Sequence, residues 1–449
     1  MSNQVGKHSG EEVPVVQLCS LSLAELHLLD PTATKDFSTL LAVLAAGENE
    51  KAWVAALQIG KLLEIGPTSS IQAVIEAGGV DILHKAMLHT DESIRSNAIW
   101  ALINLIPGSS QRTSTVLKCG CVPTLVRLLH KDESREVKKR VLWALEAIAA
   151  ESAFWRDQLL EAGGLTAISA IVSDRTYLKK ACKVVLSIVR GRPSPQPIYK
   201  SQADSFLLAH LSLENGLQTN CDLLCGLNHI TDYSGLSQAH CQLLVRLVES
   251  AEVTVIVPAL HTISRILAET DTYTDILVES GLLEILKELL YRPQSATHYG
   301  VSWFLCDITT HSIHIVDIVV LSGLISPAIS AFHTDTSDIK TQMIETLANV
   351  CISCSPYLIP QILAEGIASP LIEALSFEDN ETVSKCIEGL AVLIQFSKED
   401  SNPKMLNMHM NVEELAEKCR KLANEGLSAA QGLLKEADWL LSGTRKLHI

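Results

Sequence analysis

A repeat of about 42 residues runs through most of this 449-residue chain and restricts the folds that it can adopt. Glycines that interrupt helical segments recur at steps of 42 or 43 residues within two sets: Gly78, Gly120 and Gly163, then Gly281, Gly323 and Gly366. The interval between the two sets has room for three slightly shorter repeats that have lost the glycine. In a tandem array each unit is stabilised by its neighbours, so one long domain is possible where a globule of this length would divide.

A long apolar helical segment recurs with a similar period. Its equivalent positions, at steps of 36 to 43 residues, are Leu57, Trp100, Trp143, Lys183, Cys225, His261, Trp303, Glu345 and Glu388. Each unit reads as a short helix after the glycine, a helix such as VPTLVRLLH, a charged break such as KDESRE, and the long helix. Three helices per unit of this length are typical of armadillo repeats. The sequence therefore predicts an all-α, armadillo-repeat right-handed superhelical solenoid.

The expected organisation has three parts. Residues 1–36 form a flexible N-terminal segment, residues 37–410 form about nine repeats, and residues 411–449 form C-terminal capping helices and a tail. The three prolines in residues 190–203 predict a loop there, and a second gap is expected at residues 398–410.

Composition limits the kinds of partner. The formal net charge of -15 disfavours nucleic acid and favours a positively charged partner. Most of the 12 cysteines lie in apolar helical runs, which indicates reduced thiols, and the single CxxC, Cys351 and Cys354, has no second pair. With no membrane-length apolar run and no catalytic motif, we expect a protein of the cytoplasm and nucleus that is not an enzyme and uses no metal or cofactor.

The recurring Trp frame suggests a ligand. Trp100 and Asn104 are four residues apart, so they share one face of a helix that lines the inner side of such a repeat array. An indole face attracts a cation, and a carboxamide can hold the backbone of an extended peptide. A series of such pairs would bind a basic peptide. Trp53, Trp155 and Trp439 fall outside this frame and are expected to be packing residues.

The segments AIWALINLIPGSSQRT, LWALEAIAAESAF and KKACKVVLSIVRGRPSPQP resemble the second, third and fourth armadillo repeats of importin alpha, the adaptor that binds nuclear localisation signals. The resemblance implies a major peptide-binding site at Trp100, Asn104, Gly108, Thr113, Trp143 and Glu151. It also implies departures from the family. Ala147 replaces the Asn partner of Trp143, and Lys183 and Ser187 stand where Trp and Asn are expected, so a cation there would repel a basic peptide.

The resemblance implies a weaker minor site as well, formed by Asp232, Trp303, Asp307 and Asn349. In this region Asp307 stands in an Asn position and Glu345 in a Trp position. The family begins with a basic segment that recruits importin beta, whereas the first fifty residues contain two basic residues, Lys7 and Lys35. We therefore expect weak or no association with importin beta. The leading hypothesis is an adaptor for basic motifs of cargo proteins; the alternative is an armadillo scaffold that has lost import and binds another protein.

Overall fold

The protein is described by a computed structural model. It describes residues 34–446, except residues 66–67, 107–109, 230–234, 251, 293–294, 335 and 400–408. All regular secondary structure in these ranges is helical. The predicted flexible segment, residues 1–36, lies almost wholly outside the described residues. The contacts divide the chain into two compact units, with the boundary near His210.

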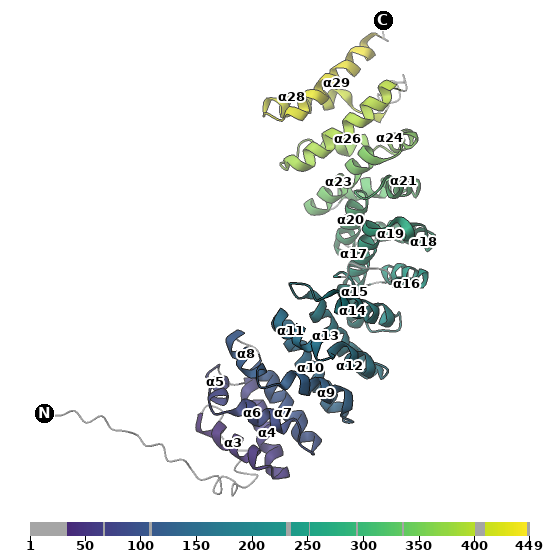
Figure 1. The fold of residues 1–449 in the computed structure, drawn as a ribbon. Coiled ribbons are helices and arrows are strands. Elements are labelled where there is room, and N and C mark those ends of the chain that lie inside the picture. The colour runs from purple at the N-terminus through teal and green to yellow at the C-terminus, as the bar shows by residue number, and fades with distance from the viewer. Residues whose placement is uncertain are drawn as a thin grey trace, which may run out of the picture. The chain divides into compact units, whose positions relative to one another are not determined.

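The first unit contains repeats of three helices (Figure 1). The four long helices pack against one another in chain order: α4 (Asn49–Ile65), α7 (Glu92–Leu105), α10 (Arg135–Glu151) and α13 (Leu178–Arg190). The other helices are α3 (Thr34–Ala46), α5 (Thr68–Glu76), α6 (Gly79–Ala86), α8 (Ser110–Leu117), α9 (Cys121–Lys131), α11 (Ala153–Glu161), α12 (Gly164–Ile171), η1 (Arg175–Tyr177) and α14 (Pro197–His210).

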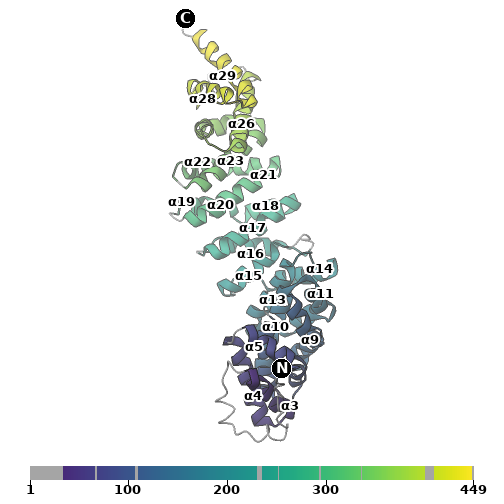
Figure 2. The same cartoon turned by 90° about the vertical axis from the view of Figure 1, so that its left-hand side faces the viewer.

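The second unit continues the same pattern (Figure 2). Its long helices pack in sequence as α15 (Leu217–Leu227), α17 (Val253–Glu269), α20 (Ser295–Ile308), α23 (Ser337–Ser353), α26 (Asn380–Glu399) and α29 (Ser428–Lys446). The remaining helices are α16 (Gln238–Val248), η2 (Asp271–Tyr273), α18 (Thr274–Glu279), α19 (Leu282–Tyr291), α21 (Ile313–Leu321), α22 (Ile325–Thr334), η3 (Pro356–Leu358), α24 (Ile359–Ala364), α25 (Ala368–Ala374) and α28 (Val412–Asn424).

The repeat glycines lie at the turn between the short first helix and the second helix of each repeat. Gly120, for example, has φ 85° and directly precedes α9, and Gly163 has φ 83° before α12. This left-handed backbone region is strained for residues with a Cβ, which explains why glycine marks the period. All six glycines of the two predicted sets have φ between 72° and 90°.

Two details of the predicted repeat were wrong. The short helix of each unit lies before the glycine rather than after it, as α8 lies before Gly120. The proline loop is also shorter than residues 190–203, because α14 begins at Pro197. Proline is tolerated in the first turn of a helix, where its missing N–H has no intrahelical partner. The loop therefore ends at Gln196.

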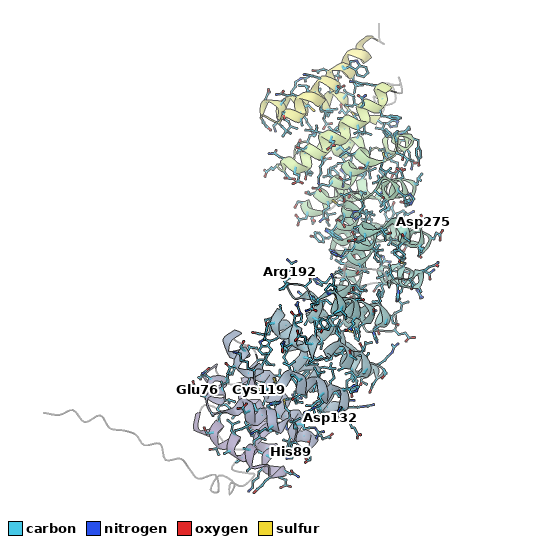
Figure 3. All side chains as sticks on the ribbon, viewed as in Figure 1. Glu76, His89, Cys119, Asp132, Arg192 and Asp275 are labelled. Atoms are coloured by element: carbon cyan, nitrogen blue, oxygen red, sulfur yellow. The ribbon has the colours of Figure 1, made fainter. Side chains whose placement is uncertain are left out.

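Polar contacts set the position of α7 relative to α10. The Asp91 carboxylate caps α7 by accepting hydrogen bonds from the backbone N–H groups of Ser93 and Ile94. Arg95 then donates two hydrogen bonds to the Asp132 carboxylate just before α10, at 2.7 and 3.0 Å (Asp132 is labelled in Figure 3). Both side chains are largely buried, and a bidentate guanidinium–carboxylate pair fixes orientation as well as distance. Neighbouring long helices are thereby held in register.

None of the described cysteines forms a disulfide bond. Cys351 lies in α23 and Cys354 directly follows this helix, and both are buried. Within the described ranges no group of three or more metal-ligating side chains is found. No single described helix is long and apolar enough to cross a bilayer; two pairs reach that length and composition only together, α21 with α22 and α23 with the η3–α24 segment, and they are bent by 82° and 120°.

Candidate functional site

The candidate site lies on the exposed side of α4, α7, α10 and α13, which we call the long-helix face. Apolar residues at helical spacing bury the other sides of these helices; Val141, Leu145 and Ile148 of α10, for example, are fully buried. The frame positions of the sequence remain on the outside. Trp143 is 43% exposed, and Trp100 is half-buried. The two indoles therefore lie on neighbouring long helices, as predicted.

Trp100 packs on the preceding repeat. A Cβ added at Gly60 of α4 would lie 2.5 Å from Cε3 of Trp100, so the indole rests directly on that glycine. The guanidinium of Arg140, from α10, lies over the same indole with its carbon 4.9 Å from the ring centroid. The ring therefore contacts α4 on one part of its surface and a cation of this chain on another.

Trp143 is also next to cations of the chain itself. The Lys180 ammonium of α13 lies 4.9 Å from its ring centroid, and Arg140 lies 5.5 Å away. Lys180 also forms an ion pair of 2.9 Å with Glu146, one turn beyond Trp143. A basic peptide that used these two indoles would have to displace Arg140 and Lys180. This self-occupation was not predicted from the sequence.

The amide positions connect neighbouring repeats. Asn104 donates from Nδ2 to the carbonyl oxygen of Gly60 at 3.1 Å. In the second unit Asn349 donates to the carbonyl of Cys306 at 3.4 Å, and to the hydroxyl of Thr309 at 3.2 Å. Gly60 and Cys306 each lie three residues after a frame position, so the two contacts are equivalent. These carboxamides join adjacent long helices, so the Asn104 amide already donates to one acceptor and the Asn349 amide to two.

Asp307 also joins neighbouring long helices, but its side chain accepts a hydrogen bond where Asn104 and Asn349 donate one. Its carboxylate accepts a hydrogen bond from the Ser264 hydroxyl, 43 residues earlier in the chain. Trp303 stacks on His261, with ring centroids 3.7 Å apart and an angle of 28° between the planes. Burial lowers the pKa of His261, against an opposing effect of Asp307, which favours the neutral imidazole. The face of Trp303 therefore has an aromatic neighbour from its own unit.

One other predicted residue, Thr113, is not available on the long-helix face. Thr113 is fully buried, and its hydroxyl donates to the carbonyl of Ile106 at 2.6 Å, so the structure does not place this side chain in the site. Gly108 and Asp232 lie outside the described residues. Glu151 is half-buried at the last position of α10.

Trp53 is a surface residue that the sequence pattern assigned to packing. It is 39% exposed and lines a pocket of about 220 Å³. The lining comes from three long helices and includes two carboxylates: Trp53, Leu57, Glu92, Ser93, Ser96, Asn97, Ser134, Glu136 and Arg140. Trp53 precedes Leu57 by four residues, one turn of helix, and this spacing was the signal that could have placed it on the same face.

Comparisons with known proteins agree with this architecture. Importin subunit alpha-1b of Oryza sativa subsp. japonica is 27% identical over 358 residues, which is 78% of this chain and 67% of that protein. Importin subunit alpha-8 of Arabidopsis thaliana is 22% identical over 387 residues, covering 84% and 87% of the two chains. The chain spans 55% of the length of another rice relative, importin subunit alpha-1a.

Two further comparisons concern parts of the chain and its fold. The family model of the SIL1/FES1/HPBP1 C-terminal domain matches residues 70–189. The crystal structure of an engineered protein superposes with a TM-score of 0.72 at 21% identity, covering 91% of this chain and 99% of that one. Together with the three-helix repeats, these matches show an armadillo-repeat solenoid that is similar over most of its length to importin alpha subunits.

Proposed function

We propose that this protein is a peptide-binding adaptor of the nuclear-import type, which binds basic motifs of cargo proteins and moves between cytoplasm and nucleus. The observation that carries the proposal is the series of indoles on the long-helix face of the first unit, one on each of three successive long helices: Trp53, Trp100 and Trp143. Flat indole surfaces spaced by one repeat suit an extended peptide with long cationic side chains.

The basic motif binds best at the end of this face formed by α4 and α7. There the pocket beside Trp53 contains the carboxylate of Glu92, and that of Glu136, which pairs with Arg140 at 3.3 Å. A lysine side chain can lay its aliphatic stem on the indole and place its ammonium next to Glu92. At the α10–α13 end, in contrast, Lys180 and Lys183 would repel such a peptide. The proposed site is therefore centred on Trp53 and Trp100.

Replacing Trp100 and Asn104 together with alanine is expected to weaken binding of a fluorescein-labelled lysine-rich peptide about fivefold to tenfold. The loss of one cation–π contact and one amide contact has this size. Fluorescence anisotropy measures the affinity, which we expect to be micromolar for the unchanged protein. Gly60→Ala should have a similar effect because the added methyl group displaces the Trp100 ring.

Trp439→Ala is the matched control, because Trp439 is also exposed with a lysine over its ring but lies in α29 of the second unit. The Trp439→Ala variant should bind the peptide with the same affinity as the unchanged protein. Absence of binding at any concentration, or equal loss in the Trp439 control, would contradict the proposal.

A scaffold that has lost import is the second candidate function. The observation that favours it is the occupation of both indoles by Arg140 and Lys180. If these cations hold the rings permanently, the lysine-rich peptide will not bind, and a different protein segment will be the ligand. The same titration separates the two candidates.

A further inference from the structure

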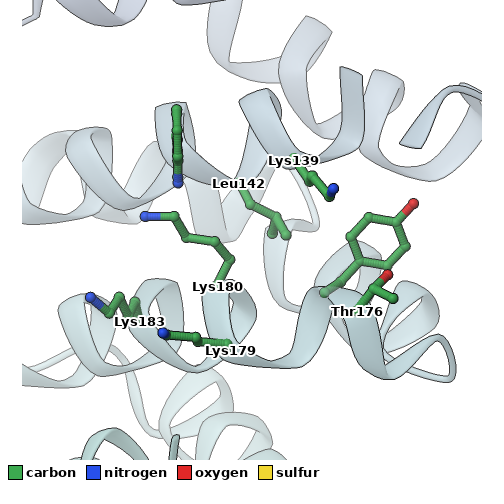
Figure 4. Close-up of a pocket in the computed structure, with 8 residues that line it drawn as sticks. Lys139, Leu142, Thr176, Lys179, Lys180 and Lys183 are labelled. Atoms are coloured by element: carbon green, nitrogen blue, oxygen red, sulfur yellow. The ribbon is translucent and has the colours of Figure 1, made fainter. Parts of the chain in front are cut away.

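A cluster of lysines surrounds a pocket between α10 and α13. The pocket has a volume of about 260 Å³, and its lining contains four lysines and no carboxylate: Lys139, Leu142, Trp143, Thr176, Tyr177, Lys179, Lys180 and Lys183. Figure 4 shows Lys179, Lys180 and Lys183 of α13 extending toward one side of the pocket, whereas Lys139 of α10 extends toward the other side. This local charge is opposite to the net charge of -15 of the whole chain.

Most of this positive charge is not neutralised by the protein. Lys180 pairs with Glu146, but none of the carboxylates that the structure describes lies within ion-pair distance of Lys139, Lys179 or Lys183. Ammonium groups gathered in this way repel one another, and the repulsion is relieved when an anion binds among them. The uncompensated positive charge of this cluster therefore favours binding of a negatively charged ligand.

The interior of the pocket is apolar. Leu142 and Tyr177 are buried, and Trp143 presents an exposed indole, so the lysines form a charged rim around an apolar floor. A volume of about 260 Å³ is below the range of about 300–1,000 Å³ that is usual for small-molecule sites. It suits one large apolar side chain, whose flanking residues would reach the rim.

We infer that this pocket binds an acidic segment of a partner protein, with an apolar side chain on the Leu142–Trp143 floor and carboxylates at Lys139, Lys179 and Lys183. A peptide fits better than a nucleic acid, because a phosphate backbone needs an extended basic surface. Here Glu136 and Glu146 lie on the same helix α10 and interrupt the basic surface. The inference adds a second site of opposite charge preference to the basic-motif site on α4 and α7.

The test uses the full chain and a fluorescein-labelled peptide with acidic residues on both sides of a central leucine. We expect saturable binding by anisotropy that weakens as salt is added. Lys139→Glu with Lys183→Glu should weaken it at least tenfold. The matched control is Lys118→Glu with Lys131→Glu, which reverses two exposed lysines of the same unit outside the pocket and should change the affinity less than twofold. Circular dichroism checks that both variants are folded.

The inference would be overturned by no binding of the acidic peptide, by equal weakening in the control variant, or by equal affinity for a peptide whose leucine is replaced by serine. An oligonucleotide of equal charge that binds as tightly would also overturn it, because the site would then select charge alone. The lysine-rich peptide is titrated in parallel. It should bind the Lys139→Glu, Lys183→Glu variant at least as tightly as the unchanged protein, so failure of this inference is distinguished from failure of the proposed function.

Discussion

Replacing Arg140 and Lys180 with alanine is expected to tighten binding of the lysine-rich peptide about thirtyfold. In the unchanged protein Arg140 and Lys180 lie 4.9 Å from the centroids of the Trp100 and Trp143 rings, so the peptide must displace Arg140 at Trp100 and cannot contact Trp143; the variant frees both rings. Each exposed cation–π contact contributes about 0.5–1 kcal/mol, and removing two like charges next to the peptide adds a similar amount. A sum of about 2 kcal/mol corresponds to the predicted change in the dissociation constant.

The Arg140→Ala, Lys180→Ala variant also removes the ion-pair partners of two carboxylates on α10. Glu136 now pairs with Arg140 at 3.3 Å, and Glu146 pairs with Lys180. Both would become available to cationic side chains of the peptide. Arg127→Ala with Lys131→Ala is the control, because it removes the same charge from α9, away from the long-helix face. An affinity that rises equally in the control would mean that net charge, not the two indoles, determines binding.

Arg156→Ala is expected to lower the free energy of unfolding by about 3–5 kcal/mol. Arg156 is 1% exposed, and its guanidinium donates to the carbonyl of Pro193 at 2.5 Å and to the Asp157 carboxylate at 2.9 Å. The substitution leaves a cavity and removes the partner of a backbone carbonyl in the loop before α14. Asp157 is partly exposed, so its charge remains solvated and adds little to the loss.

Urea unfolding followed by circular dichroism measures this effect. Arg156→Lys keeps the charge but cannot donate to both partners in the same geometry, so its midpoint should fall between those of the alanine variant and the unchanged protein. Arg127→Ala on the surface of α9 should change the free energy by less than about 0.5 kcal/mol. A midpoint for Arg156→Ala equal to that of Arg127→Ala would show that the buried guanidinium does not hold the loop.

The repeat architecture was predictable because its markers are dictated by backbone geometry. Gly120 and Gly163 occupy left-handed turns that a side chain would strain, and apolar spacing defines the long helices between them. The positions of Trp100 and Trp143 on neighbouring helices followed from the same period. The boundary of the proline loop was missed because Pro197 fits the first turn of a helix as well as a loop.

The state of the candidate site was harder to predict. The spacing of residues along a helix predicts which face of the helix each side chain occupies. The position of the charged end of a long side chain depends instead on its contacts with neighbouring helices. Arg140 and Lys180 each lie three residues before a frame position, which puts them on the same face. Their contacts with the indoles depend on the stacking of α7, α10 and α13. The use of the Asn104 amide on Gly60 likewise depends on how closely α4 and α7 approach.

The long-helix face of the first unit is the centre of this account, and the indole N–H resonances of its tryptophans test it directly. In protein labelled with ¹⁵N-tryptophan and assigned by single Trp→Phe variants, the lysine-rich peptide should shift Trp53 and Trp100. The acidic peptide should shift Trp143 most. Shifts confined to Trp155, Trp303 and Trp439, or no shift of any indole with either peptide at saturating concentration, would contradict the account.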